Sequence, residues 1–234
     1  MKQAMILAAG LGTRLKPLTD TMPKALVPVG GKPLLEWNIR KLQAQGYDRF
    51  VINIHHFAQQ IRDYVAQQDY APLVHFSDET SQLLETGGGL KHAQNLFSDE
   101  EPILIHNVDI LDNVDYAWFA RQHQTDEDAV LLVSQRKTKR YLLFDNAMHL
   151  MGWKNIETGE VKGCEGRSLA FSGIHLLGPN TFPLFDQMPD RFGIIDFYLK
   201  FCQQYVFLGN EKRNLRLLDV GKLDSLEQAE QFLK

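Results

Sequence analysis

A single loop near the start of the chain concentrates residue types that bind phosphate. The loop follows an apolar run at residues 4–7, and up to Lys24 it holds Gly10, Gly12, Thr13, Arg14, Lys16 and Thr19. Glycine lets the backbone approach a ligand closely, and free N–H groups in such a loop form a concave site for anions. Arginine and lysine compensate phosphate charge, arginine as a bidentate fork and lysine as a point charge. The loop therefore predicts phosphate binding at the end of the first strand.

Two common phosphate-binding motifs do not fit this loop. The dinucleotide fingerprint G-x-G-x-x-G needs a third glycine where the chain has Leu15, and the G-x-x-x-x-G-K-[ST] of a P-loop is absent from the sequence. A purely structural turn would not need Thr13, Arg14 and Lys24 together. We therefore favour a phosphate loop of another kind.

Strands and helices alternate over the first 135 residues. Apolar runs predict buried strands at residues 4–7, 50–54, 73–76, 103–106 and 129–133. Apolar residues at helical spacing predict helices at residues 34–42, 58–65, 90–97 and 116–124. We expect residues 25–29 to be extended and Gly87 to Gly89 to form a loop before the third helix. This alternation predicts a Rossmann-like α/β fold, with a mixed, mostly parallel sheet and helices on both faces. Ligands on such sheets bind beyond the carboxyl ends of the strands.

The second part of the chain, residues 136–234, is less regular. Strands are predicted at residues 141–144, 150–153, 169–177, 206–208 and 215–218, and helices at 182–186 and 194–204. A last helix is expected to place Leu223, Leu226, Ala229 and Leu233 on one face. We expect the strands between 141 and 177 to form a small antiparallel excursion over the carboxyl edge of the sheet. The prediction is a single domain over 1–234, with a regular α/β part in 1–135 and a less regular part in 136–234.

Composition excludes several classes of protein. The net charge of −4 argues against a surface that coats nucleic acid, and no apolar run approaches the ~20 residues that span a bilayer. The two cysteines, Cys164 and Cys202, have no metal-binding spacing. We expect a cytoplasmic protein with reduced thiols, a monomer or a homodimer, without a nucleic-acid or membrane partner.

The loop resembles the signature of sugar-1-phosphate nucleotidyltransferases, at many positions with fixed spacing. The resemblance covers residues 7–19, 23–24, 28–29 and 32–33, and continues through 85–89, 107–109, 171–174 and 219–221. It implies the nucleotide-diphospho-sugar transferase type of fold, with nucleotide binding in residues 1–135 and sugar binding in residues 136–234. Among the short members, the chain is most similar to N-acetylmuramate-1-phosphate uridylyltransferases of cell-wall recycling, through residues 84–89. Mannose-1-phosphate guanylyltransferases share most of these motifs.

The resemblance implies a role for each matching residue. Arg14 would hold the β- and γ-phosphates, Lys24 would contact the α-phosphate or the sugar phosphate, and Asp109 and Asp219 would hold Mg²⁺. The catalytic set is then Arg14, Lys24 and Asp109. The nucleotide-binding set is Leu7, Ala9, Gly10, Gly12, Thr13, Arg14 and Gly88, and the sugar-binding set is Glu85, Ser172 and Gly173. The chain departs from the family at Val108, where a small residue is common, and offers only Glu165 and Arg167 for the Glu-Lys pair of larger relatives.

The chemistry agrees with these roles. Mg²⁺ prefers carboxylates and water and takes one or two protein ligands, so two aspartates at strand ends suit it. Metal and cations placed where charge builds up permit direct in-line transfer without a covalent intermediate. A lone aspartate after a strand is more often a turn former or a helix cap, and that is the interpretation for Asp112, Asp115 and Asp196. We interpret His55, His56 and His106 as satisfied strand-end histidines, and Trp37, Trp118 and Trp153 as packing residues.

Several substrates remain open. The expected reaction joins an NTP and a sugar 1-phosphate to give an NDP-sugar and pyrophosphate. UTP with N-acetylmuramate 1-phosphate is the first expectation, and GTP with mannose or heptose 1-phosphate is the second. A cytidylyltransferase acting on a phosphorylated amino alcohol is the third. A non-catalytic nucleotide-sugar sensor or regulator is the alternative from another class, because a fold alone does not establish activity.

Overall fold

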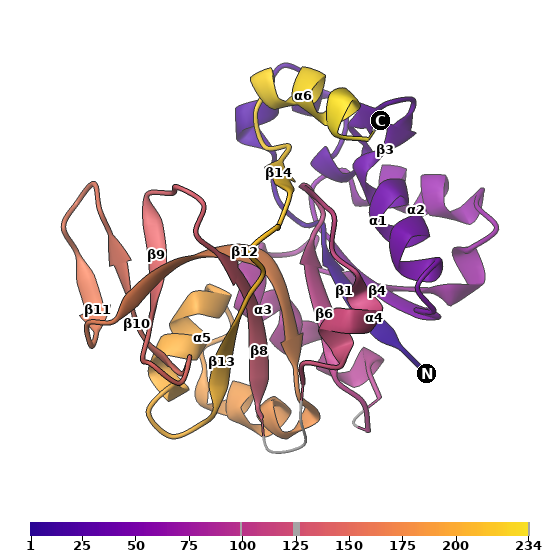
Figure 1. Cartoon of the computed structure of the whole chain (residues 1–234). Coiled ribbons are helices and arrows are strands. Elements are labelled where there is room, and N and C mark those ends of the chain that lie inside the picture. Colours follow the sequence, from indigo (N-terminus) through magenta and orange to yellow (C-terminus); the bar gives the residue numbers. More distant parts are fainter. Residues whose placement is uncertain (99, 124–126, 234) are drawn as a thin grey trace.

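The computed structural model describes residues 1–98, 100–123 and 127–233. Its centre is a sheet in which four parallel strands lie side by side in the order β5 (Val74–Asp78), β4 (Arg49–Ile54), β1 (Gln3–Leu7) and β6 (Ile103–Asn107) (Figure 1). The antiparallel strand β12 (Arg167–Leu177) follows β6 and leads to β8 (Ala129–Ser134) and β13 (Phe207–Glu211). The predicted mixed, mostly parallel sheet is confirmed.

Strand β12 belongs to two parts of the molecule. Its second half pairs with β6, while Arg167 to Leu169 pair with β9 (Arg140–Phe144). Strands β10 (Leu150–Asn155) and β11 (Val161–Gly163) complete an antiparallel extension, at the left of Figure 1. The predicted excursion is therefore present, with β11 as an additional strand. Sequence pattern missed β11 because its three residues are all exposed and carry no apolar alternation.

Helices cover both faces of the sheet. On one face, α1 (Leu34–Gln43), α2 (Ala58–Ala66) and α4 (Tyr116–Ala120) pack on one apolar cluster. On the other face, α3 (Glu85–Ala93) and α5 (Ile194–Phe201) pack on a second cluster together with the 3₁₀ segment Pro179–Gln187. Gln124, the predicted end of the fourth helix, lies outside the described residues. No helix in the described ranges is long and apolar enough to cross a bilayer.

The three consecutive glycines lie inside helix α3, so the predicted loop at Gly87 to Gly89 is wrong. A Cβ on Gly88 would lie 2.3 Å from the carbonyl oxygen of Asp190, and one on Gly89 would lie 2.7 Å from Oε1 of Glu79. Helix propensity alone disfavours glycine in a helix interior by about 1 kcal/mol. Close packing outweighs propensity here, because no larger residue fits between α3 and its neighbours.

The last elements pack against the glycine loop rather than on the main sheet. Strand β14 (Leu217–Asp219) pairs with β7 (Ile110–Asp112), and α6 (Asp224–Phe232) follows it. Ala229 belongs to the apolar cluster that holds Leu15 of the loop, whereas Leu223 is 41% exposed and does not belong to the buried face that we expected for it.

The remaining elements are short: β2 (Pro28–Val29), β3 (Lys32–Pro33) and the 3₁₀ turns Thr13–Leu15, Leu18–Asp20, Lys24–Leu26, Ala71–Leu73 and Gln94–Leu96. The segment 25–29 is therefore only partly extended.

Replacing Gly88 by alanine tests the close packing of α3. The added methyl group would meet backbone rather than a flexible side chain, and overpacking of this kind costs about 1–3 kcal/mol. We expect Gly88→Ala to lower the free energy of unfolding by that amount in urea titrations. Glu230→Ala, on the exposed side of α6, is the control and should change it by less than about 0.5 kcal/mol. Equal stability of Gly88→Ala and the parent protein would contradict the packing argument.

Candidate active site

A cavity of about 400 Å³, which we call the loop cavity, opens at the carboxyl ends of β1 and β6. Six residues of the predicted set line it, namely Leu7, Ala9, Gly10, Lys24, Glu85 and Asp109. Its other walls come from Asn53, Leu83, Thr86, Asn107 and Val108. Strand ends from three different parts of the sequence therefore meet the glycine loop at one place.

The glycine loop is fixed by its own backbone. Gly12 adopts the left-handed conformation with a φ of 65° and begins the turn at Thr13–Leu15. Its carbonyl oxygen accepts hydrogen bonds from the backbone N–H of Leu15 and from the hydroxyl of buried Thr19, both at 2.8 Å. A Cβ on Gly12 would lie 2.8 Å from Cγ2 of Thr19, so only glycine fits. Thr13 and Arg14 remain exposed, where they can reach a ligand.

Two aspartates far apart in the sequence lie next to each other. Asp219 pairs with Ile110 across the β7–β14 ladder, and the backbone N–H of Val220 donates to the carbonyl of Asp109 at 2.8 Å. The carboxyl groups of Asp109 and Asp219 lie within hydrogen-bond reach of each other. Loss of part of its water shell raises the pKa of Asp219, and the negative charge of Asp109 raises it further.

Two cations lie beside this pair of carboxylates. Lys24 forms an ion pair with Asp109, and the two side chains are only 12% and 15% exposed. Arg14 lies against Gly221, where a Cβ would be 2.7 Å from Nη2 of Arg14, and its charge lowers the pKa of Asp219. Two adjacent carboxylates that repel each other are the donor set that Mg²⁺ prefers, so these residues fit a divalent cation. The described residues contain no larger cluster of His, Cys, Asp and Glu side chains of the kind that would hold a metal without added water.

A buried pair behind the loop cavity positions its walls. Asn53 accepts from the backbone N–H of Ala8 at 2.7 Å and donates to Glu79 at 2.8 Å. Glu79, which is 1% exposed, also accepts from the backbone N–H of Leu84 at 3.1 Å, and burial raises its pKa. The pair thus links the start of the glycine loop to the segment before α3. We did not identify these residues from the sequence, although a polar residue within the apolar run 50–54 was a usable signal.

Asp112 forms the predicted turn, in which its carboxylate accepts from a backbone N–H two residues later, and it is also the centre of a buried network that the sequence did not indicate. Its carboxylate accepts from the hydroxyl of Tyr116 at 2.7 Å, from the backbone N–H of Val114 at 2.7 Å and from Lys41. Nε2 of His106 lies 3.1 Å away. These bonds fix the end of β7, where Asp112 lies three residues after Asp109. Asp115 does cap α4, accepting from the backbone N–H of Trp118 at 2.8 Å.

The remaining predicted residues lie around this centre. Glu85 forms an ion pair with Arg191 at 2.9 Å, and Gly88 faces the Asp190 backbone. Ser172 bonds to the backbone of Ile174, and Gly173 packs against Asn107 with a φ of 77°. Their roles toward a ligand remain predictions. Of the Glu-Lys candidates, Arg167 pairs with Glu211 and Glu165 is exposed, and neither lines the loop cavity.

The structure supports the structural roles expected for most histidines and tryptophans. His55 and His106 bond to backbone carbonyls, and Nε1 of Trp37 donates to the carbonyl of Val29 at 2.8 Å. Asp196 lies in the first turn of α5, so its expected capping role stays a prediction. Asp196 and Trp153 also line a second cavity.

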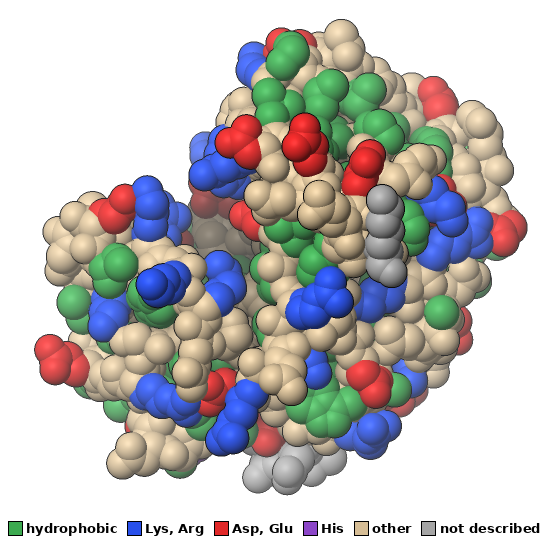
Figure 2. Space-filling model, turned by 45° about the horizontal axis from the view of Figure 1, so that its top comes forward, with side chains coloured by type: hydrophobic (Ala, Val, Ile, Leu, Met, Phe, Trp, Pro, Cys, Tyr) green, Lys and Arg blue, Asp and Glu red, His purple; other side chains and the backbone are tan. Residues whose placement is uncertain are grey.

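That second cavity of about 390 Å³, which we call the basic cavity, lies between α5 and the antiparallel extension. It is lined by Arg136, Thr138, Arg140, Tyr141, Leu142, Trp153, Lys162, Phe171, Ile195, Asp196 and Leu199. Figure 2 shows a hollow between the extension and the part that carries α6, with Lys and Arg side chains on its rim. Its three cations, Arg136, Arg140 and Lys162, were not predicted as site residues from the sequence, because they form no contiguous motif.

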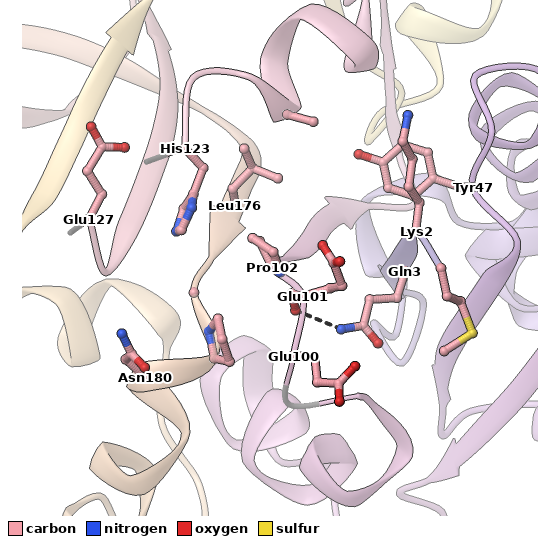
Figure 3. Close-up of a pocket in the computed structure, with 14 residues that line it drawn as sticks. Lys2, Gln3, Tyr47, Glu100, Glu101, Pro102, His123, Glu127, Leu176 and Asn180 are labelled. Carbon is pink, nitrogen blue, oxygen red and sulfur yellow. Dashed lines mark hydrogen bonds between the residues drawn. The ribbon is translucent and has the colours of Figure 1, made fainter. Parts of the chain in front are cut away.

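A further cavity of about 510 Å³ lies at the opposite edge of the sheet (Figure 3). Its walls include Gln3 and Pro102 beside the amino ends of β1 and β6, together with Glu100, Glu101 and Glu127. Three carboxylates would repel a nucleoside triphosphate, and ligands of parallel sheets bind at the other edge. The loop cavity is therefore the better candidate for phosphate chemistry, although it is the smaller of the two.

The fold and this arrangement define a class of protein that handles phosphates at the carboxyl edge of an α/β sheet. Residues 3–142 match the family model described as nucleotidyl transferase. The chain belongs to the nucleotidyl transferase family, and its relatives are sugar-1-phosphate nucleotidyltransferases.

Two relatives carry the same description. An N-acetylmuramate alpha-1-phosphate uridylyltransferase of Caulobacter vibrioides is 45% identical over 111 residues, which is 46% of this chain and 46% of that protein. The protein of that description from Neisseria meningitidis is 34% identical over 188 residues, 77% of each chain. This chain thus matches just under half of the first relative and about three quarters of the second.

Solved structures share the fold. HddC from Yersinia pseudotuberculosis, solved in complex with GMP-PN, has a TM-score of 0.79 at 26% identity, with all of both chains covered. A putative glucose-1-phosphate thymidylyltransferase from Bacillus anthracis has a TM-score of 0.83 at 17% identity and covers 99% of this chain and 95% of its own. The expected nucleotide-diphospho-sugar transferase fold is therefore confirmed.

Replacing Asp112 by asparagine tests the network behind the site. Burial alone would raise the pKa of this carboxyl, but the hydrogen bonds with His106 and Lys41 and the charge of Lys41 hold the pKa below its ordinary range. Since the folded pKa is depressed, the stabilisation is present above the unfolded pKa of about 4 and is lost as the pH falls below it. We expect Asp112→Asn to cost about 3 kcal/mol at pH 7, because Lys41 loses its partner, and to lose less stability than the parent between pH 5 and pH 3.

Urea unfolding at several pH values measures both effects. Asp63→Asn, an exposed carboxylate on α2, is the matched control and should follow the parent curve. A variant at position 112 with the parent's acid dependence would show that this carboxylate is not the stabilising group.

Proposed function

We propose that this chain transfers a nucleotidyl group from an NTP to a sugar 1-phosphate, with Mg²⁺, releasing pyrophosphate. The observation that carries the proposal is the pair Asp109 and Asp219, with Lys24 and Arg14 beside it at the glycine loop. A cavity of about 400 Å³ next to this pair has the volume of small-ligand pockets. Family membership supports the same class of reaction.

Each residue has a task that follows from its position. The glycine loop would present backbone N–H groups to the phosphates, and exposed Arg14 would neutralise the departing pyrophosphate. Lys24 borders the loop cavity and would hold the α-phosphate or the sugar phosphate. Fixed cations lower the barrier because charge accumulates on phosphate oxygens in the transition state. The transfer needs no nucleophilic side chain, because an oxygen of the sugar 1-phosphate would attack the α-phosphorus of the NTP directly.

Asp109 and Asp219 would hold the metal ion. When bound, Mg²⁺ would neutralise phosphate oxygens and orient the two reactants. The β7–β14 ladder fixes the spacing between the two carboxylates before any cation arrives. Lys24 forms an ion pair with Asp109 and also lines the loop cavity, so its ammonium group would lie between the proposed metal ligand and the phosphates.

The relatives support a particular pair of substrates. Two of them are described as N-acetylmuramate alpha-1-phosphate uridylyltransferases, which makes UTP and N-acetylmuramate 1-phosphate our first choice. GTP with mannose or heptose 1-phosphate is the second choice. It is supported by the Yersinia structure with GMP-PN and by a mannose-1-phosphate guanyltransferase of Yarrowia lipolytica that is 29% identical over 194 residues.

Pyrophosphate release from the purified protein tests the reaction. With UTP and N-acetylmuramate 1-phosphate we expect turnover that EDTA abolishes and added Mg²⁺ restores. A panel that pairs UTP, GTP, CTP and dTTP with several sugar 1-phosphates ranks the alternatives. Absence of turnover with every pair, in the presence of Mg²⁺, would refute catalysis and favour a non-catalytic nucleotide-sugar regulator.

Single substitutions test the carboxylate pair. We expect Asp109→Asn and Asp219→Asn each to reduce kcat by at least ~10²-fold, the scale for loss of one electrostatic stabiliser. Asp186→Asn, an exposed residue outside both cavities, is the matched control and should keep the parent kcat. Circular dichroism shows whether each variant is folded. Full activity in either of the first two variants would remove that aspartate from the mechanism.

A further inference from the structure

The basic cavity carries an excess of positive charge that the reaction itself does not require. Its lining contains three cations, Arg136, Arg140 and Lys162, and a single carboxylate, Asp196. The chain as a whole has a net charge of −4, so this excess is local. The phosphates already have Arg14 and Lys24 at the glycine loop. A second group of cations therefore indicates a second negative charge on the ligand.

The basic cavity adjoins the loop cavity through two elements. Phe171 lines the basic cavity, and Gly173, two residues later on β12, packs against Asn107 of the loop cavity. At the other wall, the hydroxyl of Thr86 in the loop cavity accepts from the backbone N–H of Ile194, next to Ile195 of the basic cavity. The two cavities are therefore bordered by the same two elements, β12 and the start of α5.

Arg136 also lies within electrostatic reach of the carboxylate pair beside the loop cavity. Its guanidinium interacts with the carboxylate of Asp219, which raises the pKa of Arg136, while partial desolvation lowers that pKa by more. Its Nη2 donates to the carbonyl of Phe171 at 2.8 Å. This single bond leaves most of the five N–H donors of the guanidinium for a ligand.

The two arginines of the basic cavity differ from other arginines of the molecule. Arg40, Arg62, Arg167 and Arg191 each pair with a carboxylate of the chain. Arg136 and Arg140 have no such ion pair within residues 1–98, 100–123 and 127–233. Lys162 shares its charge with Glu160 at 3.7 Å and lies over the ring of Trp153. The guanidinium groups of Arg136 and Arg140 are thus free to donate hydrogen bonds to an anionic ligand in this cavity.

We propose that the basic cavity selects sugar 1-phosphates that carry a carboxylate in addition to the phosphate. Arg136 and Arg140 bind that carboxylate, because a guanidinium matches the two oxygens of a carboxylate as a fork. Tyr141, Trp153 and Phe171 give the cavity apolar faces that pack against a sugar ring. Asp196, on the α5 side, accepts hydrogen bonds from sugar hydroxyls. The inference rests on the proposed nucleotidyl transfer and specifies the class of acceptor.

A matched pair of acceptors tests this selection. N-acetylmuramate 1-phosphate and N-acetylglucosamine 1-phosphate differ only by the lactyl ether that bears the carboxylate. With UTP, we expect kcat/KM of the parent protein to be at least ~10-fold higher for the acidic sugar, as for charge-assisted hydrogen bonds. The ratio of kcat/KM for the acidic sugar to kcat/KM for the neutral sugar should fall about tenfold, toward unity, in Arg136→Gln and in Arg140→Gln. Arg136→Lys should retain part of this preference. Lys139→Gln, a neighbouring cation that pairs with Glu157, is the control and should keep the ratio.

Different results overturn the inference and the proposed function. Equal kcat/KM for the two acceptors in the parent protein would overturn the selection while leaving nucleotidyl transfer intact. If Arg136→Gln lowered the activity on both acceptors by the same factor, Arg136 would bind the phosphates or stabilise the fold. That result would overturn its role in selecting the acceptor. If no NTP and sugar phosphate react, calorimetric binding of the two sugar phosphates decides independently. Tighter binding of the acidic sugar that Arg136→Gln removes would then support the inference, and equal affinity would overturn it.

Discussion

The repulsion between the carboxylates of Asp109 and Asp219 is the constraint around which this edge of the molecule is built. Two like charges within hydrogen-bond reach raise the free energy of the folded protein unless cations accompany them. Lys24 and Arg14 supply positive charge, and the β7–β14 ladder fixes the backbone. At the end of β7, Asp112 ties the strand to buried partners. The protein thus maintains a negative centre inside a positive surround, which is the arrangement that a metal ion and phosphates need.

The sheet topology explains how this centre meets a sugar-sized space. β12 pairs with β6 over its second half and with β9 over its first half, so one continuous strand borders both cavities. Gly173 has no side chain at the point where β12 contacts Asn107, and a Cβ there would lie 2.6 Å from Nδ2 of Asn107. The close contact brings the antiparallel extension next to the glycine loop. The proposed acceptor selection and the proposed phosphate chemistry therefore use different strands of one continuous sheet, with β12 between them.

Much of the fold and the centre of the site could be predicted from the sequence. Apolar runs located the parallel strands, because buried strands need continuous apolar side chains. The motif residues Gly10, Lys24 and Asp109 line one cavity, as expected of strand ends at one sheet edge. The glycines of α3 were misjudged because propensity is local, whereas the tight contact with Asp190 comes from residues about a hundred positions later. The Asn53–Glu79 pair and the basic cavity were missed because distant strands assemble them and no spacing in the sequence marks them.

The position of β14 in the chain has a consequence for biosynthesis. Asp109, the glycine loop and the four parallel strands all lie before residue 110, whereas Asp219 lies in one of the last elements. A growing chain emerges from the ribosome amino end first, and domains fold as their residues become available. The glycine loop and Asp109 can therefore fold before Asp219, the second carboxylate of the pair, has been synthesised. The proposed metal-binding pair would therefore be completed only when β14 joins β7, late in synthesis.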